Sequence, residues 1–141
     1  MVCSNLNNKQ LFDPFRNKWV VETPEEKVRQ ALLHKMVNHL GYPKSLIGVE
    51  KGLCSLTLSN LDRRIDIVCY CKRGQPLLLI ECKAALPLTQ VVENQLIGYN
   101  NVVKAPYLAL ANEQEVKMGF YDGKRWVFKL GFASYQQLVR T

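Results

Sequence analysis

The chain has 141 residues, of which 48% are hydrophobic and 22% charged, so its length and composition are those of one ordinary globular domain. This composition excludes an intrinsically disordered or low-complexity chain. The formal net charge of +7 favours anionic partners such as nucleic acid, although many basic proteins bind no nucleic acid.

The N-terminal residues predict neither export nor membrane insertion. MVCSNLNNKQ lacks a basic region followed by an apolar stretch, and the longest apolar runs fall far below the ~18 residues of a membrane span. The five cysteines are odd in number and lack C-x-x-C spacing, which indicates reduced thiols. We therefore expect a soluble, cytoplasmic protein without a membrane partner.

The first clear element is a helix that follows an N-terminal arm. Residues 1–22 mix aromatic and charged side chains, which predicts an arm or edge segment packed on the domain. Thr23 is a good N-cap, Pro24 suits the first helical position, and Glu26 would complete a capping box with Thr23. Gly41 predicts the end of the helix.

This helix carries one apolar stripe with an acid in line with it. The stripe consists of Val28, Leu32, Met36 and Leu40. Glu25 falls near the middle of the stripe, whereas Glu26 falls nearer its edge. An acid on the core face suggests that the helix opens onto a site, but the helix dipole favours carboxylates in any first turn.

Strands are predicted after this helix. Short segments rich in Ile, Leu and Val occur at residues 45–50, 53–59, 64–71 and 76–83. Further along the chain we predict a helix at 89–103, a strand at 106–112, a hairpin around Asp122 and Gly123, and a short helix at 134–139. The mixture predicts an α/β fold with a central sheet flanked by helices, in which the apolar run 77–80 lies in an interior strand.

Charged side chains interrupt two of these strands. Asp66 lies inside an apolar stretch, and Glu81 and Lys83 share one face at the end of LLLIECK. If the connecting turn is a two-residue loop at Arg73 and Gly74, Asp66 lies directly opposite Glu81, with Cβ atoms ~5 Å apart. A one-residue change in loop length would break this register.

Two carboxylates this close repel each other, and burying them is unfavourable unless a cation is present. Oxygen ligands at this density suit Mg²⁺, which lowers the pKa of a bound water and polarises a phosphoryl group. Lys83 would orient or deprotonate that water, or stabilise developing charge. The alternative is an ordinary ion pair between Glu81 and Lys83 at the exposed end of a strand, worth ~0–1 kcal/mol.

The pattern D-(x)n-E-x-K resembles the PD-(D/E)xK nuclease superfamily, and more closely the N-terminal nuclease domain of type I restriction enzyme R subunits. The segments that carry the resemblance are TPEEKVRQALLHKMVNHLGYP, RRIDIVCY, PLLLIECKA and ENQLIGYNNVVKAPYLALAN. The resemblance implies a single restriction-endonuclease-like domain over residues 1–141, with a mixed central sheet. Its parts would be an arm (1–22), a nuclease-like core (23–112) and a C-terminal β-hairpin and tail (113–141).

The resemblance also implies roles for particular residues. Asp66 and Glu81 would be ligands of Mg²⁺ or Mn²⁺, and Lys83 would be the catalytic lysine. The acid on the first helix would be Glu25 or Glu26, and the match to E-x-x-V-R favours Glu25 as a catalytic residue.

Two further pairs are candidates for binding the substrate. Gln95 and Tyr99 resemble a Q-x-x-x-Y element that lies beside the active site and near DNA in related nucleases, and their spacing puts both on one helix face. Alternatively, Tyr99 is a half-buried core residue and Gln95 its solvated neighbour. Arg63 and Arg64 could contact phosphates or form a solvated rim.

The chain departs from the family in three ways. Ile65 stands where a proline usually precedes the motif aspartate, Asn112-Glu113 stands where the family often has an Asn-Gly turn, and the sequence contains no Walker A motif. From the candidate residues and the resemblance we expect a Mg²⁺-dependent endonuclease-like domain that hydrolyses DNA phosphodiester bonds in restriction, defence or repair. The alternative is a non-catalytic module that binds nucleic acid or a complex. A homodimer or a larger complex is compatible with either, since cutting a duplex needs two sites or two visits.

Overall fold

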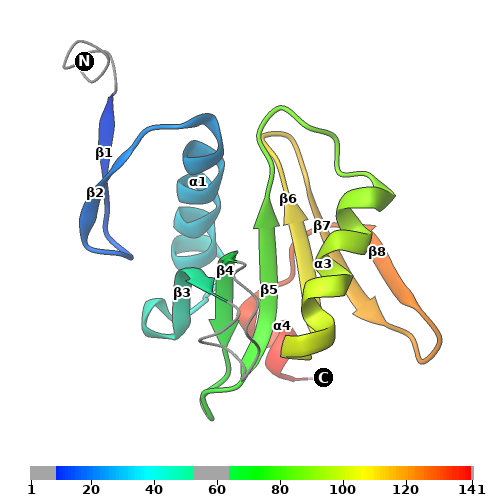
Figure 1. Ribbon diagram of the computed structural model, residues 1–141. Coiled ribbons are helices and arrows are strands. Elements are labelled where there is room, and N and C mark those ends of the chain that lie inside the picture. The colour runs from blue at the N-terminus through cyan, green and yellow to red at the C-terminus, as the bar shows by residue number, and fades with distance from the viewer. Residues whose placement is uncertain (1–8, 53–63, 141) are drawn as a thin grey trace.

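The computed structural model describes residues 9–52 and 64–140 (Figure 1). Its strands are β1 (Gln10–Asp13), β2 (Lys18–Val21), β3 (Ile47–Gly52), β4 (Arg64–Tyr70), β5 (Pro76–Cys82), β6 (Tyr107–Ala111), β7 (Val116–Tyr121) and β8 (Trp126–Leu130). Its helices are α1 (Pro24–His39), the 3-10 helix η2 (Lys44–Leu46), α3 (Gln90–Val103) and α4 (Tyr135–Val139). The strand predicted at 53–59 lies outside the described residues.

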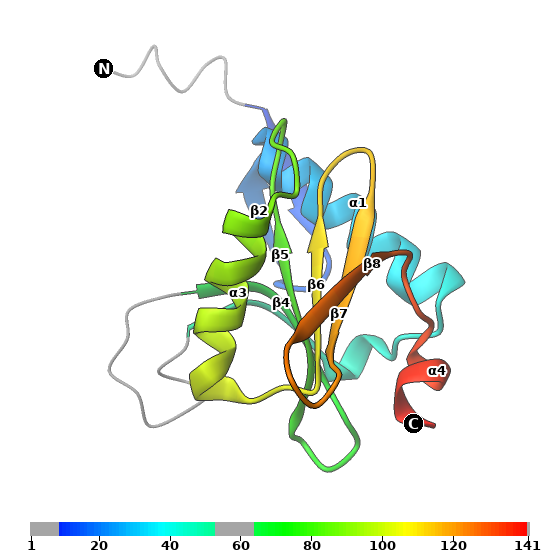
Figure 2. The ribbon, with the colours of Figure 1, turned by 90° about the vertical axis from the view of Figure 1, so that its right-hand side faces the viewer.

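A six-stranded mixed sheet forms the centre of the fold, in the order β3-β4-β5-β6-β7-β8. Its neighbouring strands are antiparallel except for β5 and β6, which are parallel and are joined through α3. Helix α3 covers one face of this sheet, and α1 and α4 lie on the other (Figure 2). The predicted α/β fold with a helix-flanked mixed sheet is therefore confirmed, and β7 and β8 extend the central sheet.

Two apolar layers cover the faces of the sheet. The α1-side core includes Val28, Leu32, Leu33, Met36, Ile67, Leu78, Ile80, Tyr135 and Leu138. The α3-side core includes Ile65, Val68, Leu79, Leu96, Leu108 and Leu110. Leu78, Leu79 and Ile80 are fully buried, which confirms that the apolar run of β5 belongs to an interior strand. Burying each such side chain contributes about 1.5–3 kcal/mol.

Helix α1 begins and ends where the sequence predicts, but its N-terminal cap differs. The hydroxyl Oγ1 of Thr23 accepts a hydrogen bond from the Glu26 amide at 3.0 Å. The Thr23 amide donates to the Val21 carbonyl instead of to Glu26, so only half of the predicted capping box forms. After the helix, Gly41 adopts φ +72°, a left-handed conformation that glycine tolerates best.

The turn between β4 and β5 is longer than predicted, and a bulge offsets it. The Cys71 amide donates to the Gln75 carbonyl at 2.9 Å, which encloses three residues rather than two. Tyr70 then pairs with Pro76 and Cys69 with Leu78, so Leu77 is an extra residue on β5. The strand period of two would place Leu77 on the face of Leu79. Because of the bulge, Leu77 packs in the α1-side core beside Leu78 instead.

Beyond the bulge the predicted register is restored, because Ile67 pairs with Ile80. Regular pairing of β4 with β5 ends there, one residue before the predicted pair of Asp66 and Glu81. The strand β4 turns over at this point: Ile65 packs in the α3-side core, whereas Ile67 packs in the α1-side core. Asp66 therefore lies at an irregular position of β4, between two residues whose side chains point to opposite faces of the sheet.

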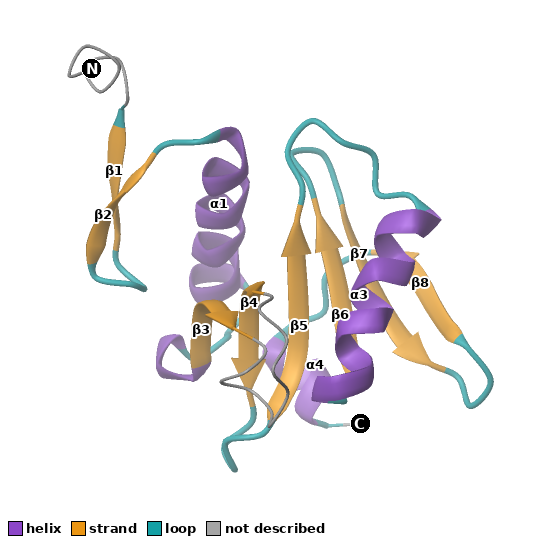
Figure 3. Cartoon of the chain, in the orientation of Figure 1, coloured by secondary structure: helices purple, strands orange, loops and turns teal. Residues whose placement is uncertain are grey.

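The N-terminal segment forms a β-hairpin of its own. Strands β1 and β2 pair as a separate two-stranded sheet beside α1, away from the central sheet (Figure 3). The Phe12 and Trp19 rings pack edge to face with centroids 5.5 Å apart. No helix within the described ranges is both long and apolar enough to cross a membrane.

Candidate functional site

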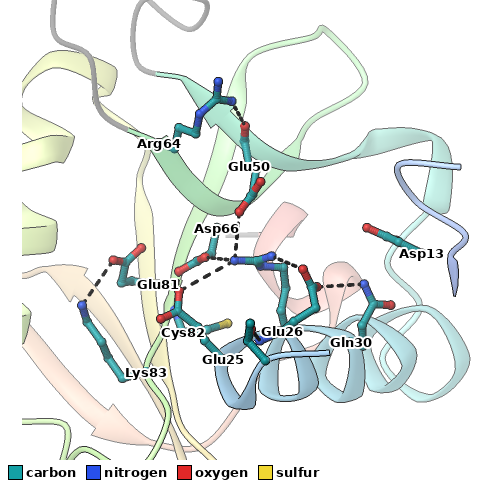
Figure 4. A network of polar contacts seen from close by, with 12 residues as sticks. Asp13, Glu25, Glu26, Gln30, Glu50, Arg64, Asp66, Glu81, Cys82 and Lys83 are labelled. Atoms are coloured by element: carbon teal, nitrogen blue, oxygen red, sulfur yellow. Dashed lines mark hydrogen bonds and ion pairs between the residues drawn. The ribbon is translucent and has the colours of Figure 1, made fainter. Parts of the chain in front are cut away.

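The carboxylate of Asp66 is buried and is held by two donors. Asp66 is 7% exposed at the irregular position of β4. Its Oδ1 accepts a hydrogen bond from Arg29 Nη2 at 2.6 Å, and its Oδ2 accepts one from the Cys82 amide at 2.8 Å. The second bond replaces a backbone partner on β4, so the side chain of Asp66 joins β4 to the end of β5. Figure 4 shows Asp66 between α1 and β5.

Glu81 lies next to Asp66 and has an unsatisfied oxygen. Its side chain is 17% exposed at the end of β5. Burial, followed by the charge of Asp66 and a hydrogen bond with Asp66, raises the pKa of Glu81 to about 8, and the charge of Lys83 opposes this shift. Oε1 of Glu81 is buried without a hydrogen-bond partner. The two carboxyl groups therefore face each other, and Glu81 retains an open acceptor.

Lys83 follows β5 and points back to Glu81. Its Nζ lies 3.6 Å from Glu81 Oε2, with 24% of the lysine side chain exposed (Figure 4). Its backbone amide donates to the Ala111 carbonyl of β6 at 2.8 Å, which fixes the chain where the lysine emerges. The side chains of E-x-K thus lie on the same side of the strand, and Lys83 is accessible to solvent.

The two acids at the start of α1 face different groups. Glu25 is 49% exposed on its side chain and lies 3.7 Å from Arg29 Nη2. Partial burial raises the pKa of Glu25, Asp66 raises it further, and Arg29 and Lys83 lower it, so Glu25 is close enough to feel all three charges. Glu26 is buried and accepts a hydrogen bond from Arg29 Nη1 at 2.8 Å. The geometry agrees with the preference for Glu25, while its role stays a prediction.

A network of two arginines surrounds these acids, and neither arginine was assigned a role from the sequence. Arg29 of α1 is 4% exposed and lies 3.3 Å from Glu50 Oε1 in addition to its bonds to Asp66 and Glu26. Arg16, from the turn between β1 and β2, pairs with Asp13, Glu26 and Glu50. We call the six residues Asp13, Arg16, Glu26, Arg29, Glu50 and Asp66 the arginine network.

One signal in the sequence could have identified Arg29. It precedes Leu32, Leu33 and Met36 by three, four and seven residues, which places an arginine on the apolar face of the helix. A charged residue on such a face is rarely buried unless it is paired. Arg16 has no comparable signal: it lies in a turn, and two of its three acidic partners, Glu26 and Glu50, come from α1 and β3.

Glu50 has a backbone conformation that suits its place in the arginine network. It adopts φ +53° between the pairs Val49–Ile67 and Lys51–Ile65, opposite Asp66. A residue other than glycine in this region costs about 1–3 kcal/mol, and such residues cluster at functional sites. The carboxylate of Glu50 reaches both arginines from this position.

Of the other predicted site residues, two lie on α3 and one lies at the start of β4. Gln95 is exposed on α3, and Tyr99 is half-buried against the α3-side core, as in the alternative interpretation of this pair. Arg64 is exposed at the start of β4, and its Nη1 donates to the Glu50 carbonyl at 3.0 Å. Arg63 lies outside the described residues.

The donors at this site fit a hard divalent cation. Asp66 and Glu81 supply carboxylate oxygens, and the unsatisfied Oε1 of Glu81 is an acceptor that a cation would satisfy. Arg29 already neutralises part of the charge on Asp66. Among residues 9–52 and 64–140, no cluster of three or more His, Cys, Asp or Glu side chains is arranged to hold a metal. Such an ion would therefore need water or substrate oxygens as further ligands.

Comparison with known proteins identifies the family. The family model described as type I restriction enzyme R protein N terminus matches residues 24–127. The matched range runs from the start of α1 into β8 and includes Glu25, Asp66, Glu81 and Lys83. A search of curated proteins found no match. Since the family model covers well over half of the sequence, the chain belongs to the family of type I restriction enzyme R protein N termini.

Proposed function

We propose that this chain is a Mg²⁺-dependent endonuclease-like domain that hydrolyses DNA phosphodiester bonds in restriction. The observation that carries the proposal is the buried pair of Asp66 and Glu81, with an unsatisfied Glu81 oxygen beside Lys83. A buried acid pair of this kind is unfavourable unless a cation or a proton compensates it. Membership of a restriction-enzyme family supports the same reaction class.

Asp66 and Glu81 would hold the ion, Mg²⁺ or Mn²⁺. When bound, the ion lowers the pKa of a coordinated water and polarises the phosphoryl group. The chain contributes the direction of both carboxylates: two donors fix Asp66, and the last residues of β5 fix Glu81. Placing these groups before the substrate arrives lowers the entropic part of the barrier.

Lys83 is the group that we expect to act on the substrate itself. Its ammonium is partly exposed and is attached to backbone that β6 fixes, so it can reach a phosphate that approaches from solvent. From there it would hold the attacking water and stabilise charge that develops on the phosphate. Glu25, half-exposed at the start of α1, would assist by accepting a hydrogen bond from water at the edge of the site.

The proposal is tested by cleavage of supercoiled plasmid and single-stranded DNA with Mg²⁺ or Mn²⁺. We expect the wild type to cut, and Asp66→Ala and Lys83→Ala each to lower the rate by at least about 100-fold, because each removes a group that fixes or stabilises the reacting atoms. Lys27→Gln is the control, since Lys27 lies in the first turn of α1 and its side chain is exposed. Activity that survives in both site variants contradicts the assignment.

A second function is favoured by one specific observation. Each oxygen of Asp66 already accepts a hydrogen bond, and Arg29 supplies a cation at the place where a metal would compensate the charge. A domain stabilised in this way can bind DNA or a protein complex without turnover. Salt-sensitive DNA binding without cleavage in the wild type and in every variant would support this module. Assembly as a homodimer or within a larger complex is part of either proposal, and sedimentation with and without duplex DNA measures it.

A further inference from the structure

The guanidinium of Arg29 is the side-chain group that connects Asp66 to the rest of the arginine network. It is nearly fully buried, and it forms short contacts with three acids on three elements: Glu26 of α1, Glu50 of β3 and Asp66 of β4. A buried cation shared in this way has little freedom to move, since leaving Asp66 would deprive a buried carboxylate of its cationic partner. The position of Arg29 is therefore set by the network as a whole.

Arg29 in turn sets the direction of the Asp66 carboxylate. That carboxylate has two donors, the Arg29 guanidinium on Oδ1 and the Cys82 amide on Oδ2. Two donors on different oxygens fix both the position and the rotation of the group. With the Cys82 amide alone, the carboxylate could turn relative to Glu81.

Arg16 makes the removal of Arg29 tolerable for the fold. It pairs with Glu26 and Glu50, the same two acids that Arg29 contacts, and with Asp13 of its own hairpin. Without Arg29, both of these acids retain a cationic partner. Within the arginine network, Arg29 therefore contacts Asp66, whereas Arg16 supports the two acids that both arginines share.

We propose that Arg29 is a positioning residue for phosphodiester hydrolysis, which acts by fixing the carboxylate of Asp66 relative to Glu81. This inference rests on the proposed function of the site. It has two consequences of opposite sign. The fixed geometry raises the rate once the metal is bound, while the positive charge of Arg29 beside Asp66 repels a divalent cation and weakens its binding.

The test measures plasmid cleavage as a function of Mg²⁺ concentration for Arg29→Gln, Arg29→Lys and the wild type. For Arg29→Gln we expect the maximal rate to fall about 10- to 100-fold and the half-saturating Mg²⁺ concentration to fall as well. Arg29→Lys keeps the charge but loses the planar fork, so its rate should fall while half-saturation stays near the wild-type value. Lys27→Gln, an exposed residue of the same helix, should change neither quantity.

The opposite signs separate positioning from a general loss of stability. A variant that is merely less folded loses rate without gaining metal affinity. The inference would therefore be overturned if Arg29→Gln had a lower rate and a lower melting temperature while its half-saturating Mg²⁺ concentration were unchanged or higher. Wild-type rate in Arg29→Gln would overturn it too. If Arg29→Gln does not fold, the rate of Arg29→Lys decides. A wild type that cleaves at no metal concentration contradicts the proposed function itself, and the inference with it.

Discussion

The carboxyl group of Glu81 binds a proton more tightly than an ordinary glutamate does. Its burial and its neighbour Asp66 hold its pKa at about 8, compared with an ordinary value of 4.5. The carboxyl group therefore binds a proton in the folded state at pH values where it has lost the proton in the unfolded chain. Folding and the protonation of Glu81 are linked for that reason.

This linkage predicts how stability depends on pH in a metal-free buffer. Because the folded state binds the extra proton, the contribution of Glu81 lowers the free energy of unfolding as pH rises from about 4.5 to about 8. Glu81→Gln removes that slope. Relative to the variant, we expect the wild type to lose about 2–4 kcal/mol across this window, measured by chemical denaturation at several pH values. Parallel curves for the two proteins would contradict the prediction.

At the residue scale, short-range patterns in the sequence predict part of the site. The period of two along a strand places Glu81 and Lys83 together, and hairpin counting brings Asp66 close to them. The contact between Arg29 and Asp66 joins residues 37 positions apart, so no local pattern predicts it. The left-handed backbone of Glu50 is equally invisible, since nothing in its neighbours requires it.

At the element scale, β5 carries both the apolar interior and the end that enters the site. Composition predicts this strand well, because its run of apolar residues is continuous. The bulge at Leu77 was not predicted, since loop length was inferred from the turn residues alone and the strand absorbed the extra residue. Two errors therefore cancelled: the longer turn and the bulge together leave Ile67 opposite Ile80.

A substitution in β5 tests the packing of this element. Leu79 is fully buried in the α3-side core, so Leu79→Ala leaves a cavity and should lower the free energy of unfolding by about 2–5 kcal/mol. Leu130→Ala is the matched control: Leu130 is 68% exposed on β8, and its loss should change stability by no more than about 0.5 kcal/mol. Urea denaturation of the three proteins measures both values. Equal losses for the two variants would show that the burial of β5 is wrong.

At the scale of the whole molecule, the site occupies one half of the sheet. Strands β3, β4 and β5 carry Glu50, Asp66 and Glu81, whereas β8 forms the opposite edge. The family match begins at residue 24, so the hairpin of β1 and β2 lies outside it and still contributes Arg16 to the arginine network. The net charge of +7 favours anionic partners, and the proposed DNA substrate is one of them.

The dependence of DNA binding on salt tests this distribution of charge. The logarithm of the affinity should fall linearly with the logarithm of salt concentration, and Arg64→Gln should reduce the slope by about 1 if Arg64 contacts a phosphate. Lys124→Gln, exposed in the turn between β7 and β8 at the far edge of the sheet, should leave the slope unchanged. Fluorescence anisotropy with a labelled duplex measures each slope. An unchanged slope for Arg64→Gln would remove Arg64 from the interface.

Binding of Mn²⁺, counted by electron paramagnetic resonance, tests the central claim most directly because it depends on neither turnover nor substrate. We expect the wild type to bind one Mn²⁺ per chain near pH 8, and Asp66→Asn and Glu81→Gln each to weaken that binding by at least about tenfold, since each removes one of the two carboxylates. Lys27→Gln should bind as the wild type does. A wild type that binds no Mn²⁺, or site variants that bind it unchanged, would contradict a metal site at Asp66 and Glu81.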